Sequence, residues 1–292
     1  MTRKWFVAAG LAAMLGLAGA SLAAGMINIK GSDTCVNLVQ RLAEVYMEKN
    51  RVPIAVTGGG SGTGIAALIN GTIDVADSSR EMKPEEIQQA KAQGFTPAEF
   101  TIAVDGLSII VNKANPVKQL TTDEVGRIFK GEITNWSQVG GASRPITLYG
   151  RQSNSGTYAF LQEHVLKGDY SPHMNQMNGN AQIVEAVKRD VTAAGYCGVG
   201  YVEREAGRTL SVLKIAKAKG QTAYSPLEKS SVDSGAYPIS RGLYQYTKGK
   251  PSGAVRDLIV WELSPAGQKV VAEEGFFTVG KAAMNKNAAN LR

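Results

Sequence analysis

Four short segments of the chain combine hydroxyl side chains with glycines or an arginine, and together they could hold a small anion. The segments are Gly31-Ser32-Asp33-Thr34, Ser61-Gly62-Thr63-Gly64, Ser78-Ser79-Arg80, and the loop from Arg151 to Thr157 that includes Ser155 and Gly156. An arginine presents a planar fork that matches two anion oxygens, while hydroxyls and backbone N–H groups donate to the others. Six or more such bonds, at about 1.5–3 kcal/mol each, exceed the roughly 8 kcal/mol of a micromolar complex before association costs. The residues therefore predict tight binding of an oxyanion that needs neither a metal nor a cofactor.

The glycine loop TGGGSGTGIAAL is ambiguous by itself, because many glycine-rich loops that open a helix hold phosphate groups. A nucleotide-binding P-loop has Lys-Ser or Lys-Thr after its glycines, whereas Gly64-Ile65 stands there. The turn that carries a nucleophilic serine needs the spacing Gly-x-Ser-x-Gly, and the residue two places after Ser61 and after Ser155 is threonine. Neither alternative fits this loop.

The histidine count weighs against hydrolytic and zinc chemistry. The chain has two histidines, His164 and His173, in one segment after the fourth loop, where a helix face and a surface turn are expected. Each serine could instead cap a helix N-terminus without binding a ligand. Four such loops with one arginine are harder to explain by capping alone.

The first 25 residues have the order of a secretory signal peptide. Arg3 and Lys4 precede an apolar stretch that ends in small residues, so we expect residues 1–24 to be a signal peptide cleaved after Ala20 or Ala23. A transmembrane anchor is the alternative, but it needs about 20 apolar residues and usually wider flanks. The net charge of +7 is too weak an excess to argue for nucleic acid as a partner.

The chain has two cysteines, Cys35 and Cys197. In an exported protein they would lie in an oxidising compartment, where a disulfide between them is chemically possible. They lie far apart in the chain. The sequence leaves open whether they pair.

Each of the four loops follows a predicted strand and precedes a predicted helix. The first helix carries Leu38, Val39, Leu42 and Tyr46 on one face, and strands are expected at 54–57, 73–76 and within 145–151. Helices are expected from Pro84 and over 120–130, the latter capped by Thr122 or Asp123 and closed by Gly131, and helical structure is expected over 252–276. Ligands of open α/β sheets gather at the carboxyl ends of the strands, so the loops are expected to face one crevice. Two β-rich runs, 100–116 and 237–247, could each cross between two domains.

The ordered set GSDT, GGGSGTG, DVADSSR, LTTDEVGRIFKGEITNW, GRQSNSGT and GVGYVE resembles the periplasmic phosphate-binding proteins of Pst-type ABC transporters. The resemblance runs from about Ile27 to the C-terminus. It implies an α/β, type II periplasmic binding protein fold, in which two lobes joined by two crossing strands close on the ligand. We expect residues 25–104 and 240–292 to form lobe I and residues 105–239 to form lobe II.

The resemblance further implies a periplasmic, monomeric solute-binding protein, without enzymatic activity, that captures inorganic phosphate and delivers it to the membrane permease subunits of an ABC transporter. Receptors for sulfate or molybdate are the alternative within binding proteins. A secreted phosphate-ester hydrolase using Ser61 or Ser155 is the alternative from another class.

Carried over to this chain, the phosphate-binding residues are expected in all four loops, with Arg151 as the only charge that reaches across the cleft. They are Thr34 with Ser32, Ser61 with Gly62, Ser78 or Ser79, and then Arg151, Ser155, Gly156 and Thr157. Arg80 could touch the ligand or form an ion pair with Asp33 or Asp77.

The chain departs from the family pattern in two loops. Ser79 stands where the family has an aspartate that accepts the proton of hydrogen phosphate; Asn154 replaces a common glycine, and Ser153 replaces an acidic residue that often supports the arginine. One hypothesis is that Asp33 supplies the missing acceptor from another direction. The alternative is that Asp33 caps the helix that starts at Thr34.

Overall fold

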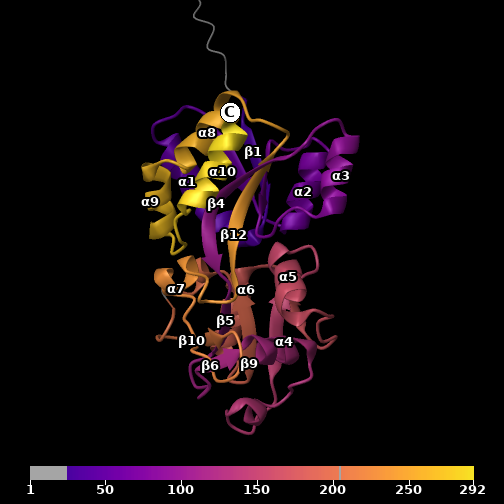
Figure 1. Ribbon diagram of the computed structural model, residues 1–292, viewed down its shortest axis with the longest axis vertical. Coiled ribbons are helices and arrows are strands. Elements are labelled where there is room, and N and C mark those ends of the chain that lie inside the picture. The colour runs from indigo at the N-terminus through magenta and orange to yellow at the C-terminus, as the bar shows by residue number, and fades with distance from the viewer. Residues whose placement is uncertain (1–24, 204) are drawn as a thin grey trace, which may run out of the picture.

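The computed structural model describes residues 25–203 and 205–292, and the predicted signal peptide lies outside these residues. Two mixed sheets, stacked along the long axis of the molecule, form the centres of two α/β lobes (Figure 1). The first sheet has the order β2 (Ile54–Thr57), β1 (Ile27–Gly31), β3 (Val75–Ser78), β12 (Ser240–Thr247) and β4 (Ala98–Gly106). The second has the order β10 (Leu210–Val212), β5 (Ser108–Asn112), β9 (Ala193–Cys197), β7 (Thr147–Arg151) and β8 (Asn175–Met177). The expected two-lobe α/β fold is confirmed.

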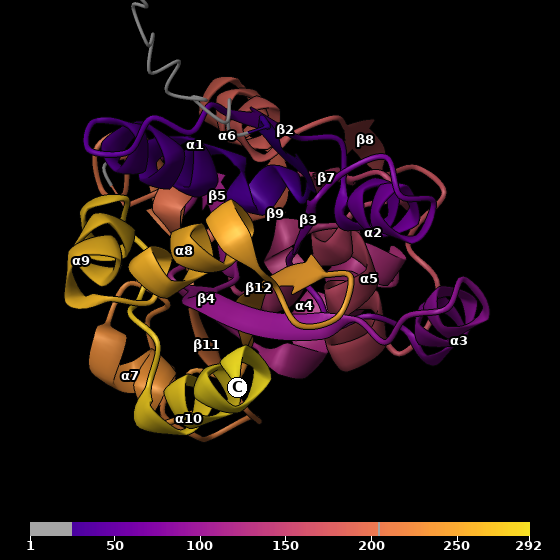
Figure 2. The same cartoon turned by 90° about the horizontal axis from the view of Figure 1, so that it is seen from above.

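Helices cover both sheets. Around the first sheet, α1 (Asp33–Met47), α8 (Gly253–Glu262) and α9 (Pro265–Glu273) group on one side, while α2 (Ser61–Ile69) and α3 (Pro84–Ala92) group on the other, as Figure 2 shows from above. A last helix, α10 (Lys281–Leu291), packs against β4. The second lobe contains α4 (Thr122–Lys130), α5 (Gly156–Leu161), α6 (Asn180–Arg189) and α7 (Lys229–Asp233). It also has the short 3-10 helices η1 (Trp136–Val139) and η3 (Val199–Tyr201), the π-helical turn η2 (Gln162–Leu166), and a small sheet of β6 (Gln119–Thr121) and β11 (Lys214–Ala216).

Two strands connect the lobes. β4 of the first sheet continues through Leu107 into β5 of the second, and the chain returns at Ile239 into β12. β4 and β12 are antiparallel neighbours, and the N–H of Leu107 donates to the carbonyl of Ile239 at 2.9 Å. The two connections between the lobes therefore lie side by side.

Several local predictions need correction. The strand expected at 73–76 is displaced to Val75–Ser78 because its hydrogen bonds to β1 begin at Val75. The cap of α4 is Thr121, whose hydroxyl accepts from the N–H of Glu124 while the Glu124 carboxylate accepts from the N–H of Thr121. The helical stretch after residue 252 is two helices, because Ser264 caps a new helix that has Pro265 in its first turn.

The apolar faces predicted for the first helix are confirmed, since Leu38, Val39, Leu42 and Tyr46 of α1 are all buried. Cys35 on α1 and Cys197 on β9 are both buried free thiols, so the pairing that the sequence left open does not occur. Burial raises the pKa of each thiol, which keeps both protonated.

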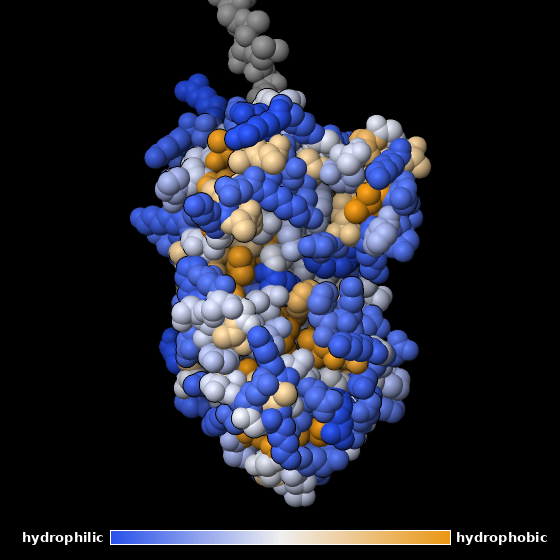
Figure 3. Space-filling model, in the orientation of Figure 1, coloured by the Kyte–Doolittle hydropathy of each residue, from blue (hydrophilic) through white to orange (hydrophobic). Residues whose placement is uncertain are grey.

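Across residues 25–203 and 205–292, no helix has the length and apolar character needed to cross a bilayer. Figure 3 shows a mostly hydrophilic face with scattered apolar side chains and no broad apolar patch. Within the same described ranges, no group of three or more His, Cys, Asp or Glu residues could hold a metal ion.

Candidate functional site

All four predicted loops meet between the two sheets. Three leave the carboxyl ends of β1, β2 and β3, and the fourth leaves the carboxyl end of β7 in the other lobe. α1, α2 and α5 begin in these loops, at Asp33, Ser61 and Gly156. Because β1 and β3 are parallel neighbours, their loops start side by side.

Five hydroxyl groups from these loops form one connected network, in which Ser79 Oγ lies 3.4 Å from Thr157 Oγ1 and so joins the two parts. Ser32 Oγ donates to Ser79 Oγ at 2.9 Å, and Ser61 Oγ lies 3.4 Å from Ser79 Oγ. Across the interface between the lobes, Thr34 Oγ1 lies 2.8 Å from Thr157 Oγ1. None of the five residues is more than 2% exposed. We call Ser32, Thr34, Ser61, Ser79 and Thr157 the hydroxyl cluster.

Gly156 allows the two lobes to approach this closely. A Cβ atom at Gly156 would lie 2.3 Å from Ser61 Oγ and 2.7 Å from Ser79 Oγ. Any side chain at this position would collide with the hydroxyl cluster. The glycine of the fourth loop therefore allows the start of α5 to pack directly against Ser61 and Ser79.

The hydroxyl cluster is arranged to donate protons. Because N–H groups donate to four of the hydroxyl oxygens, each of these hydroxyls can give its own proton to a further acceptor, and in this structure neighbouring hydroxyls accept some of those protons. The N–H donors are Thr34 N to Ser32 Oγ at 3.2 Å, Ser79 N to Ser61 Oγ at 3.1 Å, Asn180 Nδ2 to Thr34 Oγ1 at 3.4 Å and Arg241 Nη2 to Thr157 Oγ1 at 3.0 Å. The positive ends of the dipoles of α1 and α2 lie beside the same oxygens. This is the chemistry of an anion site.

Arg151 places a buried guanidinium at the edge of the cluster. Its Nη2 donates to the carbonyl of Asn178 at 3.0 Å, and its Nη1 lies 3.5 Å from Asp33 Oδ1. Its Nε is buried and has no hydrogen-bond partner among the described residues. Burial lowers the pKa of Arg151, and the Asp33 carboxylate raises it. A buried N–H without an acceptor is costly, and an anion oxygen would satisfy it.

Asp33 is the first residue of α1, and its carboxylate reaches across the interface to two residues of lobe II, Asn180 and Arg151. Its Oδ1 accepts from the N–H and from the side-chain amide of Asn180, both at 2.9 Å, as well as facing Arg151. It thus caps α6, whereas α1 is capped by Ser32. The prediction that Asp33 caps the helix starting at Thr34 is wrong. Asp33 supplies the carboxylate beside the arginine that Ser153 does not.

The remaining predicted residues surround the hydroxyl cluster without joining it. Ser155 Oγ caps α5 by accepting from the N–H groups of Thr157 and Tyr158. Ser78 Oγ donates to the carbonyl of Arg80 within its own loop at 2.6 Å. The N–H of Gly62 donates across the interface to the carbonyl of Asn154 at 3.0 Å. Of Ser78 and Ser79, only Ser79 therefore lies in the cluster.

Arg80 turns away from the cluster. Its guanidinium binds the Glu86 carboxylate through two hydrogen bonds of 2.6 and 2.7 Å. The ion pair is thus with Glu86 on α3, and neither Asp33 nor Asp77 is its partner. Arg80 positions the third loop against α3.

Arg241 and Asp105 are site residues that the sequence reasoning missed. They face each other across the crossing strands β12 and β4, and Arg241 donates to Asp105 Oδ2 from Nε at 3.0 Å and from Nη2 at 2.8 Å. Arg241 Nη1 donates to the carbonyl of Ser79 at 2.9 Å. The expectation that Arg151 is the only charge at the interface is therefore wrong. The signal available in the sequence is one acid and one base of opposite charge, Asp105 and Arg241, each in the middle of a β-rich run.

Comparison with known proteins matches the chain along most of its length. The model of the PBP superfamily domain matches residues 18–266. "Phosphate-binding protein PstS" of Pseudomonas aeruginosa is 35% identical, with 94% of this chain and 93% of the relative covered. The protein of the same name from Bacillus subtilis is 30% identical, with 92% and 86% covered.

A solved structure has the same architecture. It is a putative phosphate ABC transporter substrate-binding protein with bound phosphate from Clostridium perfringens, with a TM-score of 0.77 and 28% identity. It covers 88% of this chain, and all of the solved chain is covered. The similarity therefore includes both lobes and the loops between them.

Proposed function

The chain belongs to the PBP superfamily and to its family of PstS phosphate-binding proteins, and from that premise we propose that it encloses one inorganic phosphate ion between its lobes. As a receptor and not an enzyme, it delivers the ion to the permease subunits of an ABC transporter. It acts as a monomer in the periplasm after removal of residues 1–24. Residues 25–104 with 240–292 form the lobe of the first sheet, and residues 105–239 form the other.

The observation that best supports this proposal is the donor arrangement of the hydroxyl cluster. Four of its hydroxyls accept from N–H groups, so the protons that they share with one another here can turn to a ligand, while Arg151 Nε is a buried donor without a partner among the described residues. A tetrahedral oxyanion can accept from all of them at once. The phosphate ligand of the Clostridium perfringens protein favours phosphate among such anions.

Calorimetric titration of the purified chain, stripped of bound phosphate, tests the ligand. We expect a micromolar or tighter complex with phosphate and weaker binding of sulfate and molybdate. A parallel assay with a chromogenic phosphate ester tests the hydrolase alternative, for which we expect no turnover. Stronger binding of sulfate or molybdate, or turnover of the ester, would contradict the proposal.

Replacing Arg151 tests the site. Because Arg151→Ala removes a charge-assisted donor, worth about 1.5–3 kcal/mol, we expect phosphate affinity to fall by at least tenfold. Arg80→Ala is the matched control, since Arg80 is bound to Glu86, and it should keep most of the affinity. Nearly intact phosphate binding by Arg151→Ala would show that the ion binds elsewhere.

A further inference from the structure

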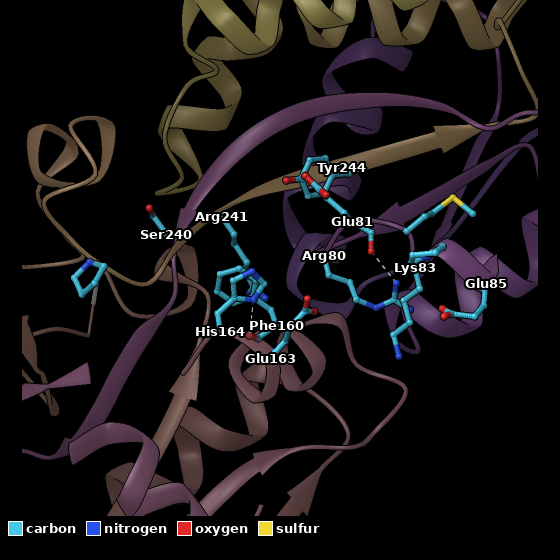
Figure 4. Close-up of a pocket in the computed structure, with 13 residues that line it drawn as sticks. Arg80, Glu81, Lys83, Glu85, Phe160, Glu163, His164, Ser240, Arg241 and Tyr244 are labelled. Atoms are coloured by element: carbon cyan, nitrogen blue, oxygen red, sulfur yellow. Dashed lines mark hydrogen bonds between the residues drawn. The ribbon is translucent and has the colours of Figure 1, made fainter. Parts of the chain in front are cut away.

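A groove of about 780 Å³ lies beside the hydroxyl cluster, between the lobes. Its walls come from the loop between β3 and α3, from the end of α5 with η2, and from β12 (Figure 4). The groove is lined by cations, acids and two aromatic rings, including Lys83, Glu163, His164, Phe160, Tyr244 and Arg241. It is large enough for a small organic molecule.

Arg241 belongs both to the groove wall and to the surroundings of the cluster. It lines the groove, and its Nη2 donates to Thr157 Oγ1 in the hydroxyl cluster at 3.0 Å. Its guanidinium carbon lies 5.3 Å from the centroid of the Phe160 ring, and His164 stacks on the same Phe160 ring with 4.3 Å between the centroids. Figure 4 shows these three side chains together at the groove. They form a layered wall between the groove and the hydroxyl cluster.

Arg241 is held in this position by four hydrogen bonds. Two go to Asp105, one to the carbonyl of Ser79 and one to Thr157. Asp105 is itself fixed, because its Oδ1 accepts from the N–H of Val199 at 2.8 Å. The Arg241 and Asp105 side chains are only 2% and 0% exposed. A guanidinium bound on so many sides cannot move aside to admit a substituent.

We propose that Arg241, fixed by Asp105 and covered by Phe160, is a specificity-determining residue that separates the hydroxyl cluster from the groove and excludes esterified phosphate. This inference rests on the proposed function and deepens it. An ester group has a carbon substituent on one phosphate oxygen, and that substituent needs space beyond the cluster. The groove offers the space, and Arg241 blocks the way to it. The receptor therefore selects free orthophosphate over phosphomonoesters.

The double variant Asp105→Asn/Arg241→Ala tests whether Arg241 separates the cluster from the groove. It removes both members of the ion pair, so no buried charge is left unpaired. Inorganic phosphate and glycerol 3-phosphate are titrated by calorimetry against the full chain. We expect the wild type to prefer phosphate by at least 100-fold and the double variant to lower that preference at least tenfold. Glu163→Ala enlarges the same groove without altering the wall, and it should keep the wild-type preference.

A second variant keeps the inference falsifiable if the double variant does not fold. Arg241→Lys retains a positive charge beside Asp105 but lacks the planar fork, so we expect the preference to fall at least threefold. The proposed role of Arg241 would be contradicted if a folded variant kept the wild-type preference for inorganic phosphate over glycerol 3-phosphate. It would also be contradicted if the wild type bound both ligands equally. If the wild type does not bind phosphate at all, the proposed function fails instead.

Discussion

Asp33 holds residues of the opposite lobe, and one of its two carboxylate oxygens, Oδ1, serves three N–H donors. Two come from Asn180, and the third comes from Arg151. Because Oδ1 is taken up by lobe II, we expect Asp33 to act mainly as a support for these donors. Its contribution to binding is to fix Arg151 and the start of α6, which any oxyanion would need equally.

Asp33→Asn is therefore expected to weaken phosphate and sulfate by a similar factor, about tenfold, because a hydrogen bond to a charged group contributes about 1.5–3 kcal/mol and asparagine retains part of it. Calorimetry with both anions measures the two factors. A loss confined to phosphate would restore Asp33 as the acceptor of the phosphate proton.

Adding a side chain at Gly156 should weaken phosphate binding for a purely steric reason. A methyl group at Gly156 would overlap Ser61 Oγ, so Gly156→Ala should prevent the lobes from meeting and lower phosphate affinity at least 100-fold. The folded state should survive, because alanine suits the first turn of α5 better than glycine does.

Gly168→Ala is the matched control, since its nearest neighbour, Lys130 Cδ, would lie 3.6 Å from the new Cβ. Phosphate titration and thermal melting of both variants distinguish loss of binding from loss of folding. Unchanged affinity of Gly156→Ala would show that the lobes bind phosphate without this contact.

Among the elements of the first lobe, two strands and a helix enclose a pair of buried acids. Asp77 on β3 lies opposite Gln245 on β12, and Gln245 Nε2 lies 3.4 Å from Glu262 Oε1 on α8. Asp77 Oδ1, Gln245 Oε1 and Glu262 Oε2 are buried without partners among the described residues. Burial raises the pKa of Asp77 to about 7, and burial together with Asp77 raises the pKa of Glu262 to about 8.

These raised pKa values predict how stability depends on pH. Both acids are protonated in the folded chain and ionised in the unfolded chain between about pH 4 and pH 7, so the folded state binds more protons. Their stabilising contribution is complete below about pH 4 and is lost as pH rises through about 7 to 8. The slope per group is at most about 1.4 kcal/mol per pH unit.

Urea unfolding at pH 5, 6, 7 and 8 measures this loss. In Asp77→Asn/Glu262→Gln the decline should become shallower, because neither replaced group titrates. Asp257→Asn removes an acid of the same helix, α8, outside the pair and should leave the decline unchanged. Equal slopes in the wild type and the double variant would mean that the pair stays ionised.

At the scale of the whole molecule, we expect phosphate to stabilise the arrangement in which the two lobes are in contact. The lobes are joined at this interface by side-chain and backbone hydrogen bonds, including Tyr201 Oη to the carbonyl of Asp33 at 2.6 Å. A ligand held by both lobes binds the folded chain and not the unfolded one, so it stabilises by about 4.1 kcal/mol at 1,000 times its Kd. We expect the melting temperature to rise by about 8 °C or more with saturating phosphate.

Differential scanning calorimetry with phosphate, and with sulfate at equal ionic strength, measures the shift. Sulfate should raise the melting temperature less. An equal rise with both salts would point to a general effect of anions rather than to enclosure between the lobes.

Sequence patterns predict site residues whose interactions are local in the chain, but not pairs of residues that are far apart in the sequence. Ser32 and Ser61 lie in loops whose glycines, flanking strands and helices are adjacent in the chain, and these were identified from local pattern. The partnership of Arg241 with Asp105, or of Asp33 with Asn180, joins residues far apart in the sequence. No local pattern specifies such pairs, since they arise only when two strands cross or two lobes meet. The sequence predicts Ser78 or Ser79 as a site residue, and the structure brings Ser79 into the cluster. A serine in place of the family's aspartate does not indicate where in the fold another carboxylate lies.

The position of β12 has a consequence for how the chain is made. This strand begins at residue 240, yet it lies between β3 and β4 inside the first sheet. Until a ribosome has added the last sixth of the chain, β3 and β4 have no neighbour to join them, whereas every strand of the second sheet has already been synthesised. The first sheet can therefore be completed only after residues 240–247 have been synthesised, an order that would suit the export proposed above.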